Sequence, residues 1–330
     1  MQGKVMNEIS ATPKVAVGID VCKGFLDIHI HPANTKFRVP NLKKGHKQLL
    51  ADLKGLDVEI VVVEATAKYH RGVHRFLHEA GLPVSVVNPL RARLFAESVG
   101  NLAKTDAVDA RMLALYGLAA KLEATPPLAE NIENLREIAR NRDAAMQAKV
   151  ALDNQLATAT VAVVKQQIAR QMKAIKTAAD ALEAAAIACI EADPVLARRR
   201  EILVSMPGIG DVTAICLLAN MPELGSLQSR QVGMLAGLAP VACDSGQRNG
   251  PRHIRGGRAV VRTGVYMATH SAARFNPHLK TFYERLLAAG KAKKLALTAV
   301  MRKLIVLANT LLKEDRCWSP QAPIAKPLPA

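Results

Sequence analysis

The chain has 330 residues, enough for two or three domains with a sizeable core. Half of the residues (50%) are hydrophobic but only 3% are aromatic, so Ala and Leu carry the apolar content and favour helix. The net charge of +17 indicates a polyanionic partner, with nucleic acid as the default, and the lack of an 18-residue apolar run argues against a membrane protein.

The five cysteines are scattered and form no CxxC pair. This pattern argues against a disulfide framework or a zinc site and favours a reducing cytoplasm.

Residues 1–13 are expected to form a loose arm, and a run of short strands and helices follows. Alternating or uninterrupted apolar residues predict five strands, at Val15–Asp20, Phe25–Ile30, Lys36–Val39, Ile60–Glu64 and Val84–Val87. Helical spacing predicts helices at Gly45–Lys54, around Val73–Leu77 and from Asn88-Pro89 toward Phe95. This order predicts a mixed α/β sheet with helices on its faces.

Four acids stand out in this first segment. Asp20 and Glu64 each end a predicted strand, where sites gather in open α/β sheets. Asp106 and Asp109 open a helix that runs on through Leu118, and their spacing of three places them on one helix face. Such a pair could hold Mg²⁺, although taken alone it is explained more simply by the preference of acids for a helix N-terminus.

Asp27 is a weaker candidate, because it lies in the middle of its strand. Together the other four acids resemble the cluster of the ribonuclease H-like nucleases, in which carboxylates hold two Mg²⁺ ions against a phosphodiester.

Pro126-Pro127 breaks the chain, and no Gly or Pro follows until Pro194. Residues recur every seven positions in this stretch, at Val161, Ile168, Ile175, Leu182 and Cys189, with a second set at Val164, Gln171, Ala178 and Ala185. The repeat predicts a coiled coil. A helix packed against its own chain and a helix used for assembly are both compatible with it, and we favour assembly.

The turn Ser205–Gly210 lies between two apolar helical stretches, Ile202–Val204 and Val212–Leu218. It resembles a helix-hairpin-helix turn, in which Gly208 and Gly210 would let backbone N–H groups approach a phosphate. The alternative is a plain turn between two helices.

A Gly- and Arg-rich loop follows a short helix at Gln231–Leu238. Residues 245–294 contain 11 Lys or Arg and one acid, which places +10 of the total charge there and predicts many phosphate contacts. The candidate phosphate-binding side chains are Arg248, Arg252, Arg255, Arg258 and Arg262.

Ser245 lies at the start of this loop and could attack phosphorus if a base or a metal activated it. A turn-forming serine is the simpler explanation from the residues alone. Ser205 and Ser271 are weaker rivals. Two more helices are predicted, at Pro277–Leu287 and Leu295–Leu312, and residues 319–330 are expected to be a disordered tail.

Five short sequence motifs, spread over almost the whole chain, resemble those of a known family. They are GID at 18–20, VEAT at 63–66, KTDAVDAR at 104–111, SMPGIG at 205–210 and GLAP…DSG…RGG at 237–257. In this order they resemble the DEDD-type insertion-sequence transposases, the IS one-ten family with its IS eleven-eleven branch.

The resemblance implies a RuvC-like, ribonuclease H-fold catalytic domain at 1–125, a helical coiled-coil region at 126–200, and a transposase domain with a catalytic serine at 201–318. It implies that Mg²⁺ is held by Asp20, Glu64, Asp106 and Asp109, and that Ser245 forms a covalent phosphoserine link to DNA.

It further implies donor and target double-stranded DNA, a structured bridge RNA that pairs with both, and a homotetramer built as a dimer of dimers. The acidic site and the serine would come from different subunits. The expected location is the bacterial cytoplasm at the nucleoid, with no membrane partner.

Two other interpretations of the residues stay open, and a third is disfavoured. A Mg²⁺-dependent junction-resolving nuclease of ribonuclease H type would use the four acids and water. A non-catalytic nucleic-acid-binding assembly protein would carry a degenerate acidic site. A sugar-kinase-like ATPase also begins with a GID-type strand, but the chain lacks a second Gly-rich phosphate loop.

Overall fold

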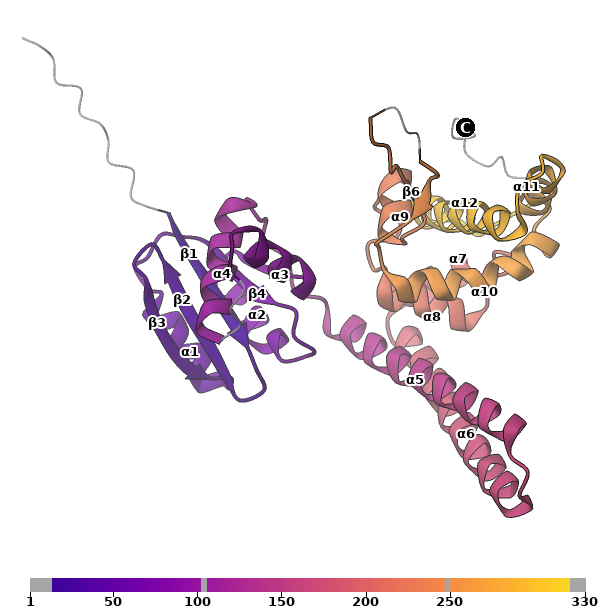
Figure 1. The fold of residues 1–330 in the computed structure, drawn as a ribbon, viewed down its shortest axis with the longest axis horizontal. Coiled ribbons are helices and arrows are strands. Elements are labelled where there is room, and N and C mark those ends of the chain that lie inside the picture. The colour runs from indigo at the N-terminus through magenta and orange to yellow at the C-terminus, as the bar shows by residue number, and fades with distance from the viewer. Residues whose placement is uncertain (1–13, 102–105, 247–249, 321–330) are drawn as a thin grey trace, which may run out of the picture. The chain divides into compact units, whose positions relative to one another are not determined.

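The computed structural model describes residues 14–101, 106–246 and 250–320, without the side chains of residues 106 and 107. The predicted N-terminal arm and nearly all of the predicted tail lie outside the described residues. Contacts divide the chain into two compact units, Met1–Leu128 and Ala129–Ala330, and Figure 1 shows the elements of each. The domain boundaries expected near residues 125, 200 and 318 stay predictions.

In its described residues, the first unit contains five strands and four helices. The strands are β1 (Val15–Val21), β2 (Phe25–His31), β3 (Thr35–Pro40), β4 (Val58–Glu64) and β5 (Val84–Val87). The helices are α1 (Lys43–Asp52), α2 (His70–Glu79), α3 (Pro89–Ser98) and α4 (Asp106–Ala119). Every strand and helix predicted for this segment is confirmed, with small differences at the ends.

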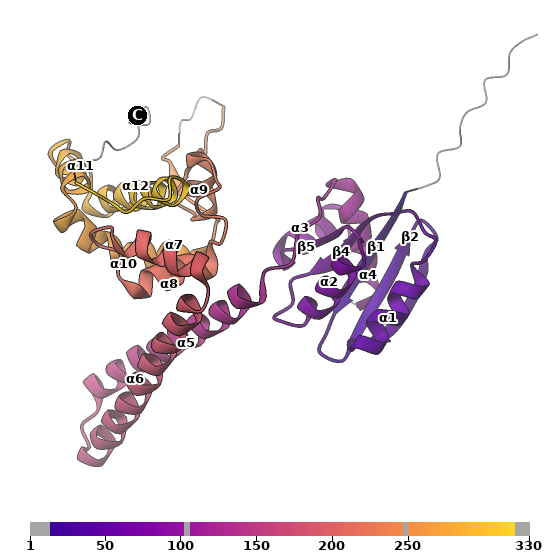
Figure 2. The same cartoon turned by 180° about the vertical axis from the view of Figure 1, so that it is seen from behind.

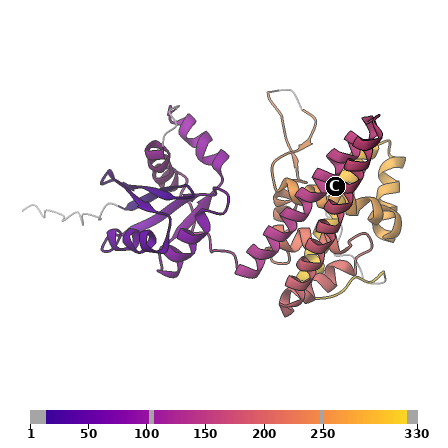
Figure 3. The same ribbon diagram turned by 90° about the horizontal axis from the view of Figure 1, so that it is seen from below.

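The five strands form one mixed sheet in the order β3-β2-β1-β4-β5. The first three strands are joined by short turns and pair antiparallel, whereas β4 and β5 follow helical crossovers and pair parallel to β1 and to each other. The prediction of a mixed α/β sheet is therefore confirmed, and Figures 2 and 3 show helices on both faces.

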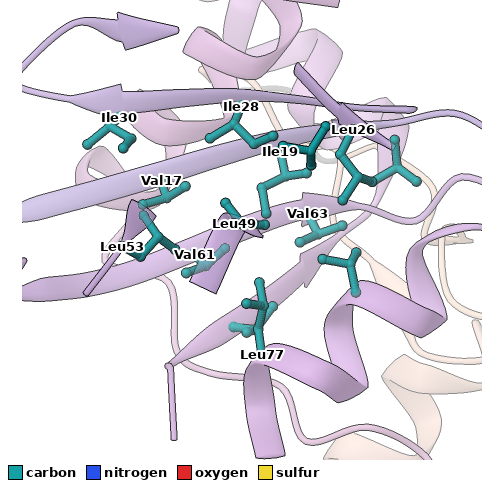
Figure 4. Packing of buried hydrophobic residues seen from close by; sticks show 14 residues of the cluster. Val17, Ile19, Leu26, Ile28, Ile30, Leu49, Leu53, Val61, Val63 and Leu77 are labelled. Atoms are coloured by element: carbon teal, nitrogen blue, oxygen red, sulfur yellow. The ribbon is translucent and has the colours of Figure 1, made fainter. Parts of the chain in front are cut away.

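Side chains alternate between the two faces of the sheet along each strand, so each face has its own hydrophobic core. On one face, strand residues such as Val17, Ile19 and Val63 pack against Leu49 of α1 and Leu77 of α2, as Figure 4 shows. Each fully buried side chain of this size stabilises the fold by about 1.5–3 kcal/mol. The other face is covered by α3 and α4, through the buried residues Ala16, Ile60, Val62, Val87, Ala92, Leu113 and Ala114.

Helix α4 lies in backbone contact with β1. A Cβ atom at Gly18 would stand 1.9 Å from the Ala110 carbonyl oxygen, so only glycine fits beneath the helix. Further along α4, a Cβ atom at Gly117 would stand 2.6 Å from Val62 Cγ2. Because Val62 pairs with Gly18 and the next contact of Gly117 is Ile60, α4 runs from the carboxyl ends of β1 and β4 toward their amino ends.

His29 lies on the same face of the sheet as Gly18, its partner on the neighbouring strand. Its side chain is 1% exposed, and neither ring nitrogen has a hydrogen-bond partner among the described residues. Burial lowers the pKa of His29, and the positive charges of Lys36, Arg111 and His31 lower it further. The imidazole is therefore held neutral in the fold.

The described part of the second unit is helical apart from one short hairpin. It comprises α5 (Glu130–Thr158), α6 (Ala162–Glu191), α7 (Pro194–Val204), α8 (Asp211–Asn220), α9 (Ser229–Leu235), β6 (Pro240–Val241), β7 (His253–Ile254), α10 (Ala259–Phe275), α11 (Pro277–Ala288) and α12 (Lys293–Lys313). Helices α5 and α6 form a long antiparallel pair, and the later helices pack together as a bundle (Figure 1).

The predicted seven-residue repeat falls on α6, which packs along α5 of its own chain. The residues of α6 that become buried are Ile168, Ala179, Ala186 and Ile190, so only part of the first predicted seam is used. The second predicted set, Val164, Gln171, Ala178 and Ala185, is exposed. The repeat therefore serves packing within the chain, and its use in assembly stays a prediction.

Three helices begin at an Asn or Asp followed by proline. Asn88, Asp193 and Asn276 cap α3, α7 and α11 by accepting hydrogen bonds from backbone N–H groups of the first turn. Proline at the first helical position loses no hydrogen bond there, because that N–H has no intrahelical partner. These starts are readable from the sequence.

Two features differ from the expectations. Helix α10 was not predicted, and the Gly- and Arg-rich segment, expected to be a loop, is pinned at its base by the pairing of β6 with β7. Within the described residues, α12 alone is long and apolar enough to span a membrane, but half (50%) of its most apolar stretch is buried in the unit, as in a core helix.

We predict that Gly18→Ala lowers thermal stability by about 3 kcal/mol and displaces α4, because the added methyl group overlaps the backbone at Ala110. Gly24→Ala is the matched control, since a Cβ atom there meets nothing within 4 Å. Thermal unfolding of both variants measures the difference. Equal melting temperatures would contradict the close contact.

We also predict that the chain loses stability as the pH falls below about 6.5, the ordinary His value. The unfolded chain then binds a proton that the folded state resists at His29, so the equilibrium shifts toward unfolding. In His29→Leu the loss of melting temperature between pH 7.5 and pH 5.5 should shrink, whereas the exposed control His253→Gln should behave like the parent chain. Identical pH profiles for all three proteins would refute this account.

Candidate active site

Asp20 and Glu64 occupy corresponding positions on neighbouring parallel strands. The strand pairing matches Ile19 with Val63, and each acid is the next residue along its strand. Both share the face of Gly18 and Val62, because side chains alternate along a strand and Ile19 and Val63 belong to the opposite core. With strands about 4.8 Å apart, the two carboxylates lie together at the carboxyl edge of the sheet.

The N-terminal turn of α4 reaches this same edge. Asp109 directly precedes Ala110, whose carbonyl lies against Gly18, two residues before Asp20. The Asp109 side chain is half-buried, and Asp106, one turn earlier, is the first residue of the helix. The structure therefore brings Asp20, Glu64 and Asp109 to one edge of the sheet, while the Asp106 side chain lies outside the described residues.

These acids are not isolated charges. Asp20, Glu64 and Asp109 each have further interactions, and Asp20 accepts a hydrogen bond from its neighbour Val21 N at 2.9 Å. Among the side chains that are described, which exclude Asp106, no three His, Cys, Asp or Glu residues are grouped closely enough to hold a metal ion. The donor set consists of carboxylate oxygens, the hard ligands that Mg²⁺ prefers.

Asp27, set aside from the sequence, lies next to this edge. It is directly opposite Asp20 in the antiparallel pairing of β1 and β2. Arg38 donates two hydrogen bonds of 2.9 Å to Asp27, from Nε and Nη2 to the two carboxylate oxygens. The register of the hairpin is the signal that could have found it, because the two strands are joined by a short turn.

Ser245 lies in the second unit, in the segment between β6 and β7. It is exposed. Its neighbour Asp244 accepts hydrogen bonds from Gly250 N at 3.1 Å and from Arg252 Nη1 at 2.6 Å, so one carboxylate ties the two sides of the segment together. Figure 1 shows the strands that bound this segment, here called the Ser245 arm (residues 240–254), beside α9.

The predicted phosphate-binding arginines differ in their surroundings. Arg258 forms two hydrogen bonds with the Glu223 carboxylate, at 2.7 and 2.8 Å, and a third with the Asn220 carbonyl. Burial, the largest single effect, raises the pKa of Glu223, but the hydrogen bond from Arg258, a backbone hydrogen bond and the positive charges of Arg258 and Arg136 together hold the pKa below its ordinary value. Arg262 donates to the Gly256 carbonyl at 2.9 Å. Both arginines therefore have a role inside the fold.

Arg252 is paired with Asp244, as described above, and Arg255 is exposed. Within the described part of the chain, Arg255 has no hydrogen bond or ion pair. Arg248 lies outside the described residues. Among the described residues, Arg255 is thus the predicted arginine that no contact inside the fold occupies.

The predicted turn Ser205–Gly210 does join two helices, α7 and α8. Gly208 has a φ of +105°, and a Cβ atom there would stand 2.6 Å from the Ala272 backbone in α10, so this glycine is required by packing. Gly210 is exposed at the start of α8. Asp211, the next residue, already places a carboxylate at that helix end and pairs with Arg200 at 2.7 Å. A phosphate role for the two glycines stays a prediction.

Comparison with known proteins supplies the family. Residues 17–165 match the transposase family DEDD_Tnp_IS110, and residues 200–284 match the Transposase IS116/IS110/IS902 family. The first match contains the strands and the helix that carry the acids, and the second contains the Ser245 arm.

Curated relatives agree with these matches. The chain is 26% identical to the pilin gene-inverting proteins of Moraxella bovis and Moraxella lacunata over 314 residues, which cover 92% of this chain and 97% of each relative. It is 29% identical to the insertion element IS110 uncharacterized 43.6 kDa protein of Streptomyces coelicolor, over 52% of this chain and 42% of that protein. The chain therefore belongs to the IS110 family of insertion-sequence transposases and is a DNA transposase or recombinase.

Proposed function

We propose that the chain cuts and rejoins DNA through a covalent phosphoserine at Ser245, with Mg²⁺ held by Asp20, Glu64, Asp106 and Asp109. The observation that carries the proposal is the matched register of Asp20 and Glu64 beneath the first turn of α4, which gathers acids at one edge of the sheet. Family membership supports a DNA substrate and a divalent metal.

The first unit supports a ribonuclease H-like, RuvC-like catalytic domain. Its strand order β3-β2-β1-β4-β5, with an antiparallel meander followed by parallel strands, places the carboxyl ends of β1 and β4 side by side. In open α/β sheets this edge is where sites form. The acids from two strands and one helix would then hold the ion from different directions.

The carboxylates fit Mg²⁺ by their chemistry, since hard oxygen ligands together with a substrate phosphate are its usual partners. When bound, the ion would neutralise charge on the scissile phosphate and lower the pKa of a bound hydroxyl. The residues of the chain would fix its position, and the tight contact of α4 with Gly18 would fix the spacing of the helix acids from the strand acids.

Ser245 would supply the covalent step. Its Oγ would form a bond to phosphorus while the bond from phosphorus to a deoxyribose oxygen breaks, and the proton that Ser245 loses is balanced by one gained on the departing oxygen. Attack by the deoxyribose hydroxyl of another strand would reverse the step and free the serine. A covalent intermediate conserves the bond, so strands are exchanged without hydrolysis.

A bridge RNA that pairs with donor and target DNA would supply sequence specificity, and we place it in the same proposal. A high positive charge with few aromatic residues supports binding through backbone phosphates, which leaves sequence to base pairing. Sequencing nuclease-protected RNA from chain expressed with its flanking DNA tests this: a discrete RNA encoded in the flank is expected, and random RNA would refute the guide.

We further propose a tetramer in the bacterial cytoplasm, at the nucleoid. The acids lie in the first unit and Ser245 in the second, so one reaction needs both units to supply groups. All five cysteines are free, as expected in a reducing compartment.

Replacing Ser245 tests the proposed function directly. In Ser245→Ala we expect the covalent protein–DNA adduct to vanish and strand exchange to fall by more than about a thousandfold, because the nucleophile is lost. Ser271→Ala, a second serine of the same unit, should retain both. Adducts are detected on denaturing gels with labelled DNA.

The same assay separates the alternatives. A junction-resolving nuclease that uses water would still cut DNA in Ser245→Ala and would form no adduct in any variant. If Asp20→Asn left cutting and exchange unchanged, the acids would have no catalytic part. If the parent chain bound DNA but neither cut nor exchanged it, the chain would be a non-catalytic binding protein.

Two arginines of the same segment should behave differently. Arg255→Ala should weaken DNA binding and reduce its salt dependence without lowering the melting temperature, because its side chain is exposed. Arg258→Ala should instead lower stability by about 1–3 kcal/mol, since it leaves the half-buried Glu223 carboxylate without its partner. Binding titrations at two salt concentrations and thermal unfolding measure the two effects, and a reversed pattern would contradict this assignment.

A further inference from the structure

We propose that Asp27 and Arg38 form a positioning pair for the metal site, in which Arg38 keeps a fifth carboxylate, Asp27, from joining the ligands beside Asp20. The inference rests on the proposed function, because it concerns the ion held at that edge. It adds two residues that neither the sequence strings nor the family's four acids point to.

The pairing of three strands sets these residues in one row. Arg38 on β3 is directly opposite Asp27 on β2, and Asp27 is directly opposite Asp20 on β1. Opposite residues of antiparallel strands share a face, with Cβ atoms about 4.5–5.5 Å apart. Asp27 is therefore as near to Asp20 on one side as Glu64 is on the other.

Two carboxylates so placed repel each other unless one of them is neutralised. Arg38 neutralises Asp27 with a two-pronged contact, at 2.9 Å to each oxygen. Both acceptor edges of the carboxylate then face the guanidinium rather than the metal site. The Asp27 side chain is only 18% exposed, so solvent screens the contact less than it would at an open surface.

Arg38 is itself held from a second side. Its guanidinium lies 5.5 Å from the centre of the Phe25 ring. Phe25 is 47% exposed, on the same strand and face as Asp27, two residues before it. The exposed ring therefore limits the motion of Arg38, which keeps the guanidinium over Asp27.

The row Arg38, Asp27, Asp20 thus holds one positive and two negative charges, and the Arg38–Asp27 pair contributes no net charge to the site. Removing Arg38 and removing Asp27 change the net charge beside Asp20 in opposite directions. Arg38→Gln leaves an unmatched carboxylate next to Asp20, and Asp27→Asn leaves an unmatched guanidinium. Replacing both returns the net charge of the pair to zero.

Binding of Mn²⁺ to the full chain, followed by the electron paramagnetic resonance signal of the free ion, tests the proposal without any catalytic readout. We expect Arg38→Gln to bind Mn²⁺ about five- to tenfold more tightly, and Asp27→Asn to bind about five- to tenfold more weakly. The double variant should return to the affinity of the parent chain. Arg38→Lys keeps the positive charge but loses the two-pronged contact, and its affinity should stay within about threefold of the parent chain.

The possible outcomes distinguish a failure of this inference from a failure of the proposed function on which it rests. If Asp20→Asn abolishes Mn²⁺ binding while Arg38→Gln and Asp27→Asn bind as the parent does, the pair has only a structural role and the inference is overturned. If the parent chain and Asp20→Asn bind alike, the metal site itself fails and the inference fails with it. Circular dichroism melting curves confirm that each variant is folded.

Discussion

Helix α4 lies so close to β1 that no side chain fits between them at position 18. A Cβ atom there would stand 1.9 Å from a backbone oxygen of the helix, so the contact is between two main chains and leaves little freedom to slide or tilt. The direction of α4 across the sheet then follows from its second contact, at Gly117 over Val62 and Ile60. Because of this constraint, the N-terminal turn of the helix ends where β1 and β4 end.

The contribution of the helix acids to the acidic edge depends on that placement. Register alone sets Asp20 beside Glu64 and opposite Asp27, whereas only the packing of α4 brings Asp109 to the same edge. Arg38 completes the row by neutralising the acid that the register places nearest to Asp20. The geometry of the site is thus fixed by backbone pairing and a backbone contact, and the side chains need to supply only charge.

In the second unit, Ser245 lies in an exposed segment that is held in place by ion pairs and by hydrogen bonds to the main chain. Asp244 joins the two sides of this arm, and Arg262 and Arg258 stabilise its base. Some of the positive charge concentrated in this region therefore holds the protein together, and among the predicted arginines that the structure describes Arg255 is left without such a contact.

The sequence predicted the first unit well, because each strand has a distinct apolar pattern and its acids fall at strand ends. It could not reveal that Gly18 is a packing contact, since a glycine before an acid also suits a turn. Asp27 lies in the middle of its strand, and only the register of the hairpin shows that it is opposite Asp20. The repeat in α6 was visible, but a heptad pattern cannot tell a partner in the same chain from one in another chain. Likewise, an arginine-rich string does not show that Arg258 is committed to Glu223.

The most direct test of this account is the position of a bound ion. Crystals of the full chain soaked in Mn²⁺ would locate the metal by its anomalous scattering. We predict a peak at the carboxyl ends of β1 and β4, within ligand distance of both Asp20 and Glu64 and absent in Asp20→Asn. A peak elsewhere, or one that persists in that variant, would contradict the claim that α4 and the sheet build a metal site.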